Sequence, residues 1–260
     1  MSCRVSIRGL GFAYETGRPV LEGVDLEIGA GERFGIIGPS GAGKSTLLLQ
    51  LNGILSPTFG SVRIGEVPVE ASTLEEVRRR VGLVFQDPDD QLFNPTVYED
   101  VAFGPRNMGM TRQDLDTAVR QTLSHLGLEG KEEASSHHLS YGERKRVALA
   151  TVLSMRPEVL AFDEPFSNLH PAMVDQLTEL IRGLDATVIL VSQALLPLTV
   201  VCDRIAILDA GRILAVGSTG KILSDRPLLR SCGLDFHHFH QRLHELIGEI
   251  PPEEGGHRHE

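Results

Sequence analysis

Residues 33–51 read RFGIIGPSGAGKSTLLLQL, and this stretch decides the fold. The apolar run 33–37 predicts a short buried strand, and the good helix formers at 45–51 predict a helix. The eight residues from Gly38 to Ser45 match G-x-x-x-x-G-K-[ST] in the strand–loop–helix context that this motif needs, which disfavours a chance glycine-rich turn. We expect backbone N–H groups to surround phosphate oxygens, Lys44 to reach the β- and γ-phosphates, and the Ser45 hydroxyl to ligate Mg²⁺. The predicted nucleotide contacts of this loop are Gly38, Pro39, Ser40, Gly41, Ala42, Gly43, Lys44, Ser45 and Thr46.

A phosphate-binding loop needs a carboxylate at the end of a neighbouring strand. The apolar run 159–162 ends in Asp163 and Glu164. Adjacent carboxylates alone are typical of an ordinary strand-end turn, but beside a phosphate loop they indicate catalysis. We predict that Asp163 holds Mg²⁺ and that Glu164 is the general base for the attacking water.

Composition narrows the class of protein. The chain has 260 residues, 41% hydrophobic and 23% charged, and this length predicts one large domain or two small ones. A formal net charge of −10 disfavours sequence-independent binding to nucleic acid, so no nucleic-acid partner is expected. Three widely spaced cysteines predict reduced thiols, as in the cytosol. We find neither a secretory signal nor an apolar run of about 20 residues, so any membrane role is expected to come through a partner.

The order of predicted elements indicates an α/β fold. Short strands are predicted at 4–8, 20–28, 61–65 and 81–85, and the pattern from 87 to 158 is mostly helical. Strands at 159–162, 187–191 and 204–208, with a helix at 171–183, then restore βα alternation. Such alternation favours a parallel sheet covered on both faces.

A second motif identifies the family. The run from Leu139 to Arg146, LSYGERKR, resembles the signature of ABC-transporter ATPases, and Ser140 with Glu143 also forms a predicted capping box. Gln86 resembles the Q-loop glutamine, which contacts Mg²⁺ and the reacting phosphate, and Tyr14 resembles the aromatic residue that stacks on adenine. The resemblance implies a P-loop core with an N-terminal antiparallel β subdomain and an inserted helical subdomain at about 87–158. It places the ATPase domain at 3–230 and a histidine-rich tail at 231–260.

The family works as a head-to-tail dimer, so the resemblance implies a second ATPase subunit, identical or not. Each ATP would lie between the phosphate loop of one chain and Ser140 and Gly142 of the other. The stretch 84–105, VFQDPDDQLFNPTVYEDVAFGP, looks most like ATPases of energy-coupling-factor transporters, especially cobalt and nickel importers. That likeness implies a transmembrane coupling subunit, a substrate-binding membrane subunit, and a place on the cytoplasmic face of the cell membrane.

Two positions depart from the family pattern. The family's histidine near the γ-phosphate is Gln193 here, and an amide cannot carry a positive charge or shuttle a proton. The aspartate of the D-loop is His170. We keep Gln193 as a predicted catalytic residue with Glu164 and Gln86, and we treat full hydrolytic competence as open.

Other interpretations remain. One is a soluble ABC ATPase without transport, which usually needs a coiled-coil insertion or paired cassettes, and this chain has neither. Another is a degenerate regulatory cassette, which Gln193 favours but the intact Lys44, Asp163 and Glu164 disfavour. The tail holds six of the ten histidines, and His240 with His244 has i, i+4 spacing suited to Ni²⁺, Co²⁺ or Zn²⁺. A solvated tail is the simpler interpretation.

Overall fold

The computed structural model describes residues 2–15 and 17–234. The tail histidines proposed as metal ligands lie outside the described residues. Within the described ranges, no group of three or more His, Cys, Asp or Glu side chains is arranged to hold a metal ion.

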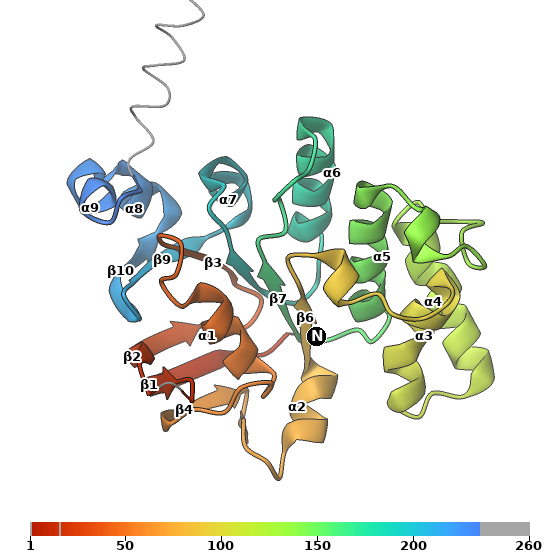
Figure 1. Cartoon of the computed structure of the whole chain (residues 1–260), viewed down its shortest axis with the longest axis horizontal. Helices are drawn as coiled ribbons and strands as arrows, with labels where there is room; N and C mark the ends of the chain where they lie inside the picture. The colour runs from red at the N-terminus through yellow and green to blue at the C-terminus, as the bar shows by residue number, and fades with distance from the viewer. Residues whose placement is uncertain (1, 16, 235–260) are drawn as a thin grey trace, which may run out of the picture.

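A six-stranded sheet forms the centre of the molecule (Figure 1), with strand order β10-β9-β3-β8-β7-β6. Five strands run parallel, and β10 is antiparallel to β9. The strands are β3 (Arg33–Ile37), β6 (Val81–Val84), β7 (Val159–Asp163), β8 (Thr187–Val191), β9 (Arg204–Asp209) and β10 (Arg212–Ser218). Because parallel strands share a direction, the loops after β3, β6, β7 and β8 meet at one edge of the sheet.

A smaller antiparallel sheet comes from the N-terminal third, with strand order β2-β1-β4-β5. Its strands are β1 (Val5–Ala13), β2 (Pro19–Ile28), β4 (Phe59–Ile64) and β5 (Val67–Pro68). Helix α1 (Lys44–Leu51) follows the glycine-rich loop, and its leucines belong to a core shared by the two sheets, in which Phe34 is fully buried. The predicted α/β class with an N-terminal antiparallel part is confirmed.

Three helices lie between β6 and β7 in the chain, where the sequence predicts helical structure. They are α3 (Val97–Asn107), α4 (Arg112–His125) and α5 (Tyr141–Leu153), with short 3₁₀ turns at Pro88–Asp90 and Ser136–His138. We call α3–α5 the helical part; it stands beside the sheet rather than on it (Figure 1). The predicted N-caps form as expected, since Thr111 accepts from the Asp114 N–H and Ser140 forms a capping box with Glu143.

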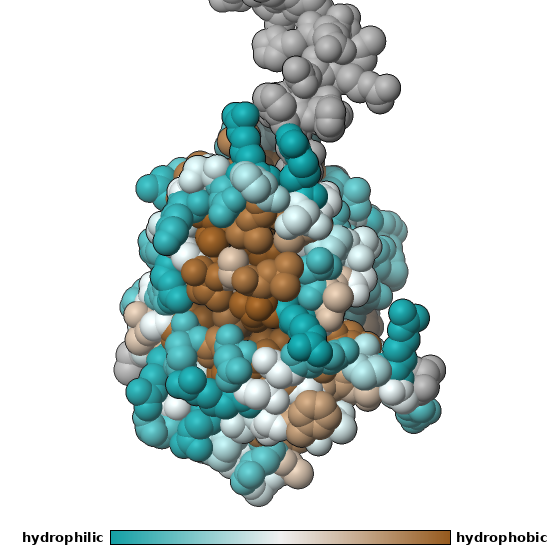
Figure 2. Space-filling view, turned by 90° about the vertical axis from the view of Figure 1, so that its left-hand side faces the viewer, coloured by the Kyte–Doolittle hydropathy of each residue, from teal (hydrophilic) through white to brown (hydrophobic). Residues whose placement is uncertain are grey.

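Several elements escape the sequence analysis. They are helix α2 (Leu74–Arg80), strands β5 and β10, and helices α7 (Leu195–Val201), α8 (Thr219–Ser224) and α9 (Arg226–Ser231), whereas α6 (Pro171–Arg182) matches its prediction. All the missed helices have only six or seven residues, too few to show a clear period. Strand β10 forms an outer edge and exposes Leu214 and Val216. Figure 2 views this side and shows apolar side chains gathered in a hollow ringed by polar ones.

Candidate functional site

The loops after β3, β6, β7 and β8 surround a cavity of about 350 Å³. The structure brings most of the predicted site residues to this cavity, as parallel-strand topology requires, whereas Gly38, Pro39 and Ala42 belong to the same loop but do not line it. The residues that line the cavity are Val20, Ser40, Gly41, Gly43, Lys44, Ser45, Thr46, Gln86, Asp163, Glu164 and Gln193.

The glycine-rich loop is held by contacts that exclude larger residues. A Cβ on Gly38 would lie 1.9 Å from the Leu208 carbonyl oxygen, so the loop leaves β3 in direct contact with β9. Gly43 has φ of +100°, and a Cβ there would lie 2.9 Å from the Val20 carbonyl oxygen. The loop therefore takes a path that only glycine allows at these two positions.

Lys44 is folded back into the loop. Its ammonium donates hydrogen bonds of 2.9 Å to the carbonyl oxygens of Gly38 and Pro39, and only 7% of the residue is exposed. Burial lowers the pKa of Lys44, while the nearby Glu164 and Asp163 raise it. The side chain thus holds a cation close to the cavity, with donors that can be transferred to phosphate oxygens.

Two carboxylates stand opposite the lysine. Burial raises the pKa of Asp163, against hydrogen bonding by the Ser45 hydroxyl and the charge of Lys44. Burial also raises the pKa of Glu164, against the hydrogen bond that its Oε2 accepts from the Gln193 N–H at 3.0 Å. Asp163 Oδ1 and Glu164 Oε1 are buried and accept no hydrogen bond from a described residue. Each carboxylate therefore keeps one oxygen for a ligand.

Glu164 sits in a strained backbone position. Its φ is +44°, in the left-handed region that few non-glycine residues adopt. Its N–H donates to the Val191 carbonyl at 2.9 Å, which holds the β7 end against β8. Such strain is typical of functional positions, where the surrounding structure dictates the conformation.

The other predicted residues lie around the rim or elsewhere. Tyr14 is 44% exposed, lies edge-on to Phe12, and its hydroxyl lies 3.2 Å from the Thr46 Oγ1. Its ring is thus placed beside the loop, outside the set that lines the cavity. Ser140 and Gly142 lie at the start of α5 and do not line the cavity.

Sequence reasoning misses two residues of the site. Val20 lines the cavity from β2, and the fully buried Ser192 hydrogen-bonds Glu164 and accepts from the Ala194 N–H at 3.0 Å. Ser192 has a weak signal, because it directly precedes Gln193 at the end of β8. Val20 has none, since only the packing of β2 on the loop brings it there.

Comparison with known proteins agrees with this geometry. The family model described as ABC transporter matches residues 21–167. The energy-coupling factor transporter ATP-binding protein EcfA of Methanothermobacter thermautotrophicus is 41% identical over 235 residues, covering 88% of this chain and 76% of the relative.

Two solved structures share the fold. CbiO1 of Clostridium perfringens, described as part of the ABC transporter complex cbiONQ, has a TM-score of 0.78 and 32% identity, covering 95% of this chain and 99% of its own. A dimeric ATP-binding cassette in a post-hydrolysis state, bound to ADP and phosphate, has a TM-score of 0.75 and 26% identity. The match covers 83% of this chain and 98% of that structure's chain. The chain therefore belongs to the ABC transporter family of ATPases and is similar, within it, to ATP-binding subunits of the energy-coupling factor type.

Proposed function

We propose that this chain binds and hydrolyses ATP to power an energy-coupling-factor importer for cobalt or nickel ions. One observation carries the proposal: a buried lysine, a glycine-rich loop and two carboxylates, each with one oxygen that has no hydrogen-bond partner among the described residues, meet at one cavity. The volume of about 350 Å³ suits the phosphate end of a nucleotide. Tyr14, exposed beside the loop, is placed to stack on the base.

The residues present fit a magnesium ion. Asp163 Oδ1 is a buried carboxylate oxygen without a hydrogen-bond donor, and the Ser45 hydroxyl lies within hydrogen-bonding reach of the same carboxylate. Hard oxygen ligands of this kind are those that Mg²⁺ takes beside phosphates. Ser45, Asp163 and Gln86 would hold the ion, which when bound neutralises charge on the phosphate oxygens.

The chain's own residues divide the chemistry. When ATP binds, the Lys44 ammonium exchanges its hydrogen bonds to the Gly38 and Pro39 carbonyl oxygens for hydrogen bonds to the β- and γ-phosphate oxygens. Glu164 Oε1 takes a proton from water, whose oxygen then bonds to the γ-phosphorus while the bond to the β–γ bridging oxygen breaks, leaving ADP and phosphate. The raised pKa of Glu164 makes it a stronger base than an exposed carboxylate.

A second ATPase subunit completes the site. Ser140 and Gly142 carry the signature at the N-terminus of α5, away from this chain's own cavity. A hydroxyl and a helix N-terminus are suited to a γ-phosphate presented by another chain. The dimeric structure of an ATP-binding cassette with ADP and phosphate, which shares this fold, supports pairing with a second subunit.

A groove next to the nucleotide site suits the transmembrane coupling subunit. It has a volume of about 560 Å³ and lies between α2, α3 and α5. Phe93 and Phe103 border it, 67% and 46% exposed, with their rings edge to face at 5.0 Å. The buried Asp100 accepts from the Phe93 N–H at 3.1 Å and so fixes the loop that presents this ring. Exposed aromatic pairs beside a groove are typical of partner-binding surfaces.

Attachment through partners would place the chain on the cytoplasmic face of the cell membrane. No helix among the described residues is long and apolar enough to cross a bilayer. The similar CbiO1 is described as part of the ABC transporter complex cbiONQ, which supports assembly of this chain into a transporter complex. We expect that complex to include a transmembrane coupling subunit and a membrane subunit that binds the substrate. Uptake of labelled Co²⁺ and Ni²⁺ by cells that express the complete transporter tests the cargo.

Lys44→Ala tests the nucleotide site. We expect ATP affinity to fall at least about a hundredfold, because the variant removes the buried cation of the loop. Lys221→Ala, an exposed lysine on α8, is the matched control and should bind ATP normally. Unchanged ATP binding by Lys44→Ala in calorimetry would refute the site.

The groove is tested separately. Phe93→Ser with Phe103→Ser should lose co-purification with membrane subunits while ATP binding is retained. Phe59→Ser removes a phenylalanine that is 59% exposed on β4 and does not line the groove, and should keep the complex. Retained co-purification of the double variant would overturn the groove assignment.

A second candidate function rests on Gln193 and His170. A regulatory cassette paired with an active one would bind ATP but turn it over slowly, because an imidazole is missing at position 193. Turnover of the purified chain, alone and with its partners, distinguishes this from an active ATPase.

A further inference from the structure

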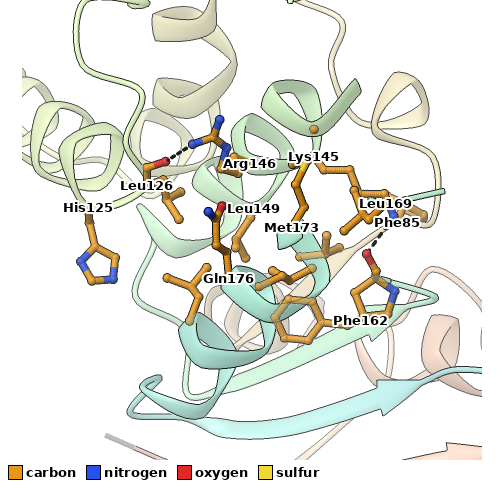
Figure 3. Close-up of a pocket in the computed structure, with 15 residues that line it drawn as sticks. Phe85, His125, Leu126, Lys145, Arg146, Leu149, Phe162, Leu169, Met173 and Gln176 are labelled. Carbon is orange, nitrogen blue, oxygen red and sulfur yellow. Dashed lines mark hydrogen bonds between the residues drawn. The ribbon is translucent and has the colours of Figure 1, made fainter. Parts of the chain in front are cut away.

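A second cavity lies outside the nucleotide site, between helix α6, which follows strand β7, and the helical part (Figure 3). Its volume is about 170 Å³. Its floor is apolar: Leu126, Leu149 and Phe162 are almost fully buried. A dry cavity of about 150 Å³ with such a lining binds benzene in another protein, so this space holds a body of about six to ten heavy atoms.

The cavity exists because α6 leaves part of its apolar face without a partner. Met173, Leu177 and Leu180 follow one another at i, i+4 and i+7, yet all three are only half-buried. A helix normally buries such a stripe against its neighbours. Here the stripe faces α5 across an open space, and apolar surface remains accessible to a small molecule.

The charge of the lining is one-sided. Lys145, Arg146 and His125 belong to it, and none of its fifteen residues is acidic, in a chain of net charge −10. Figure 3 shows Gln176 reaching from α6 toward Arg146, above the apolar floor. Arg146 uses Nη1 on the Leu126 carbonyl at 3.1 Å, which leaves further guanidinium donors.

We propose that this cavity binds a small carboxylate with an aryl or branched apolar body. The apolar body lies against Leu149, Phe162 and Leu177, and the carboxylate accepts from Arg146 and Gln176. Two features together select this class: the Arg146 cation beside the neutral Gln176 amide disfavours amines, and the closed apolar floor disfavours inorganic anions.

A ligand in this cavity would contact segments next to the predicted catalytic residue Glu164 and the signature motif. Pro165, which directly follows Glu164, and Leu169, five residues after Glu164, line the cavity, and Gly142 of the signature lines it from α5. A Cβ on Gly142 would lie 2.0 Å from the Met173 Cε, so Met173 already packs on the signature. A bound ligand would therefore fix α6 against the helical part, and the site is suited to regulation by a small metabolite.

Binding is tested with phenylacetate on the full chain, by calorimetry and ligand-observed NMR. We expect a dissociation constant of about 1 mM or tighter, from the size of the ligand. Phenylacetamide and phenethylamine keep the ring but lose the anion, and acetate keeps the anion but loses the ring; each should bind at least about tenfold more weakly. Equal binding of phenylacetamide, or no binding of phenylacetate at about 10 mM, would overturn the proposal.

Three variants locate the site. Gln176→Glu places a carboxylate at the mouth on an exposed position and should weaken phenylacetate about tenfold. Ala172→Glu adds the same charge to α6 outside the lining and should leave affinity unchanged. Leu177→Trp fills the cavity and should abolish binding. If phenylacetate binds Gln176→Glu and Leu177→Trp as it binds the parent, its site lies elsewhere and the proposal fails.

The test is independent of the proposed ATPase. Lys44→Ala, which should not bind ATP, should bind phenylacetate with parental affinity, because Lys44 does not line this cavity. Loss of phenylacetate binding in Lys44→Ala would contradict a separate site.

Discussion

Glu164→Gln separates chemistry from binding at the candidate site. In the parent, Oε2 of Glu164 accepts from the Gln193 N–H at 3.0 Å, while Oε1 is buried without a donor. The amide of glutamine keeps an oxygen for the Gln193 N–H but cannot take a proton from water. We therefore expect turnover to fall about 10²–10⁴-fold, the range for loss of a general base, or about 3–5 kcal/mol in activation free energy.

Binding and stability should respond differently from turnover. The pKa of Glu164 is raised, so the folded protein binds this proton more tightly than the unfolded chain. The resulting stabilisation is present at low pH and is lost as pH rises through the raised pKa, which leaves an unfavourable buried charge at neutral pH. Glu164→Gln removes that charge, so its melting temperature at neutral pH should equal the parent's or exceed it by about 2–4 °C. ATP binding should persist and favour a closed dimer.

The assays are phosphate release across pH, light scattering with ATP, and thermal melting. In the parent, turnover should fall as pH drops through the raised pKa of Glu164, and the residual turnover of the variant should lack this acid limb. Glu179→Gln removes an exposed carboxylate from α6 and serves as the control. A Glu164→Gln variant that hydrolyses ATP at the parental rate would refute the assignment of Glu164 as the base.

Three further predictions follow from local geometry. Gly43→Ala should destabilise the protein by about 1–3 kcal/mol more than Gly41→Ala in urea unfolding, because both have positive φ but only Gly43 meets Val20. Ser140→Ala should lower the free energy of unfolding by about 0.5–2 kcal/mol at neutral pH, because it removes the capping box. Hydrogen bonds from Ser140 lower the pKa of Glu143 to about 2, so this loss of stability should shrink as pH falls from about 4.5 toward 2. A loss that stays constant across this pH range in thermal melts would contradict the prediction. Gln193→His should raise turnover at the pH where the imidazole is charged. His170→Ala should lower turnover only if His170 of the partner's D-loop replaces the imidazole that is missing at position 193. Turnover measured across pH for both variants and for the double variant distinguishes these outcomes.

The sequence predicts what local chemistry dictates. Arg33–Ile37 is predicted and observed with the same bounds, because a run of five residues bounded by glycine-containing turns is short enough for a buried strand and too short for a typical helix. The positive φ of Gly41 and Gly43 in the next loop is also a local property, whereas Gly38 is required by its contact with the Leu208 carbonyl on the distant strand β9. The capping box of α5 belongs to the same class, as its two residues lie three apart. For the strand, the two glycines with positive φ and the capping box, no knowledge of distant strands is needed.

Other parts of the site depend on packing between distant segments. Val20 reaches the cavity because β2 packs on the loop after β3, and the sequence of residues 19–28 contains no motif that indicates a site residue. Strand β10 escapes prediction because as an outer strand it buries too little apolar surface to leave a strong pattern. The short helices α7–α9 are too short to be stable alone and depend on packing against neighbouring elements, so their own sequences carry little signal.

The apolar cavity beside α6 shows where the two kinds of information meet. The spacing of Met173, Leu177 and Leu180 is visible in the sequence and predicts a buried helix face. Only the structure shows that this face is left half-covered, because α5 stands apart from it and meets α6 mainly through Gly142 and Met173. An apolar stripe that a fold leaves uncovered lowers stability unless something else occupies it. The cavity therefore carries an energetic reason for a ligand, and the basic residues at its mouth define which ligand that is.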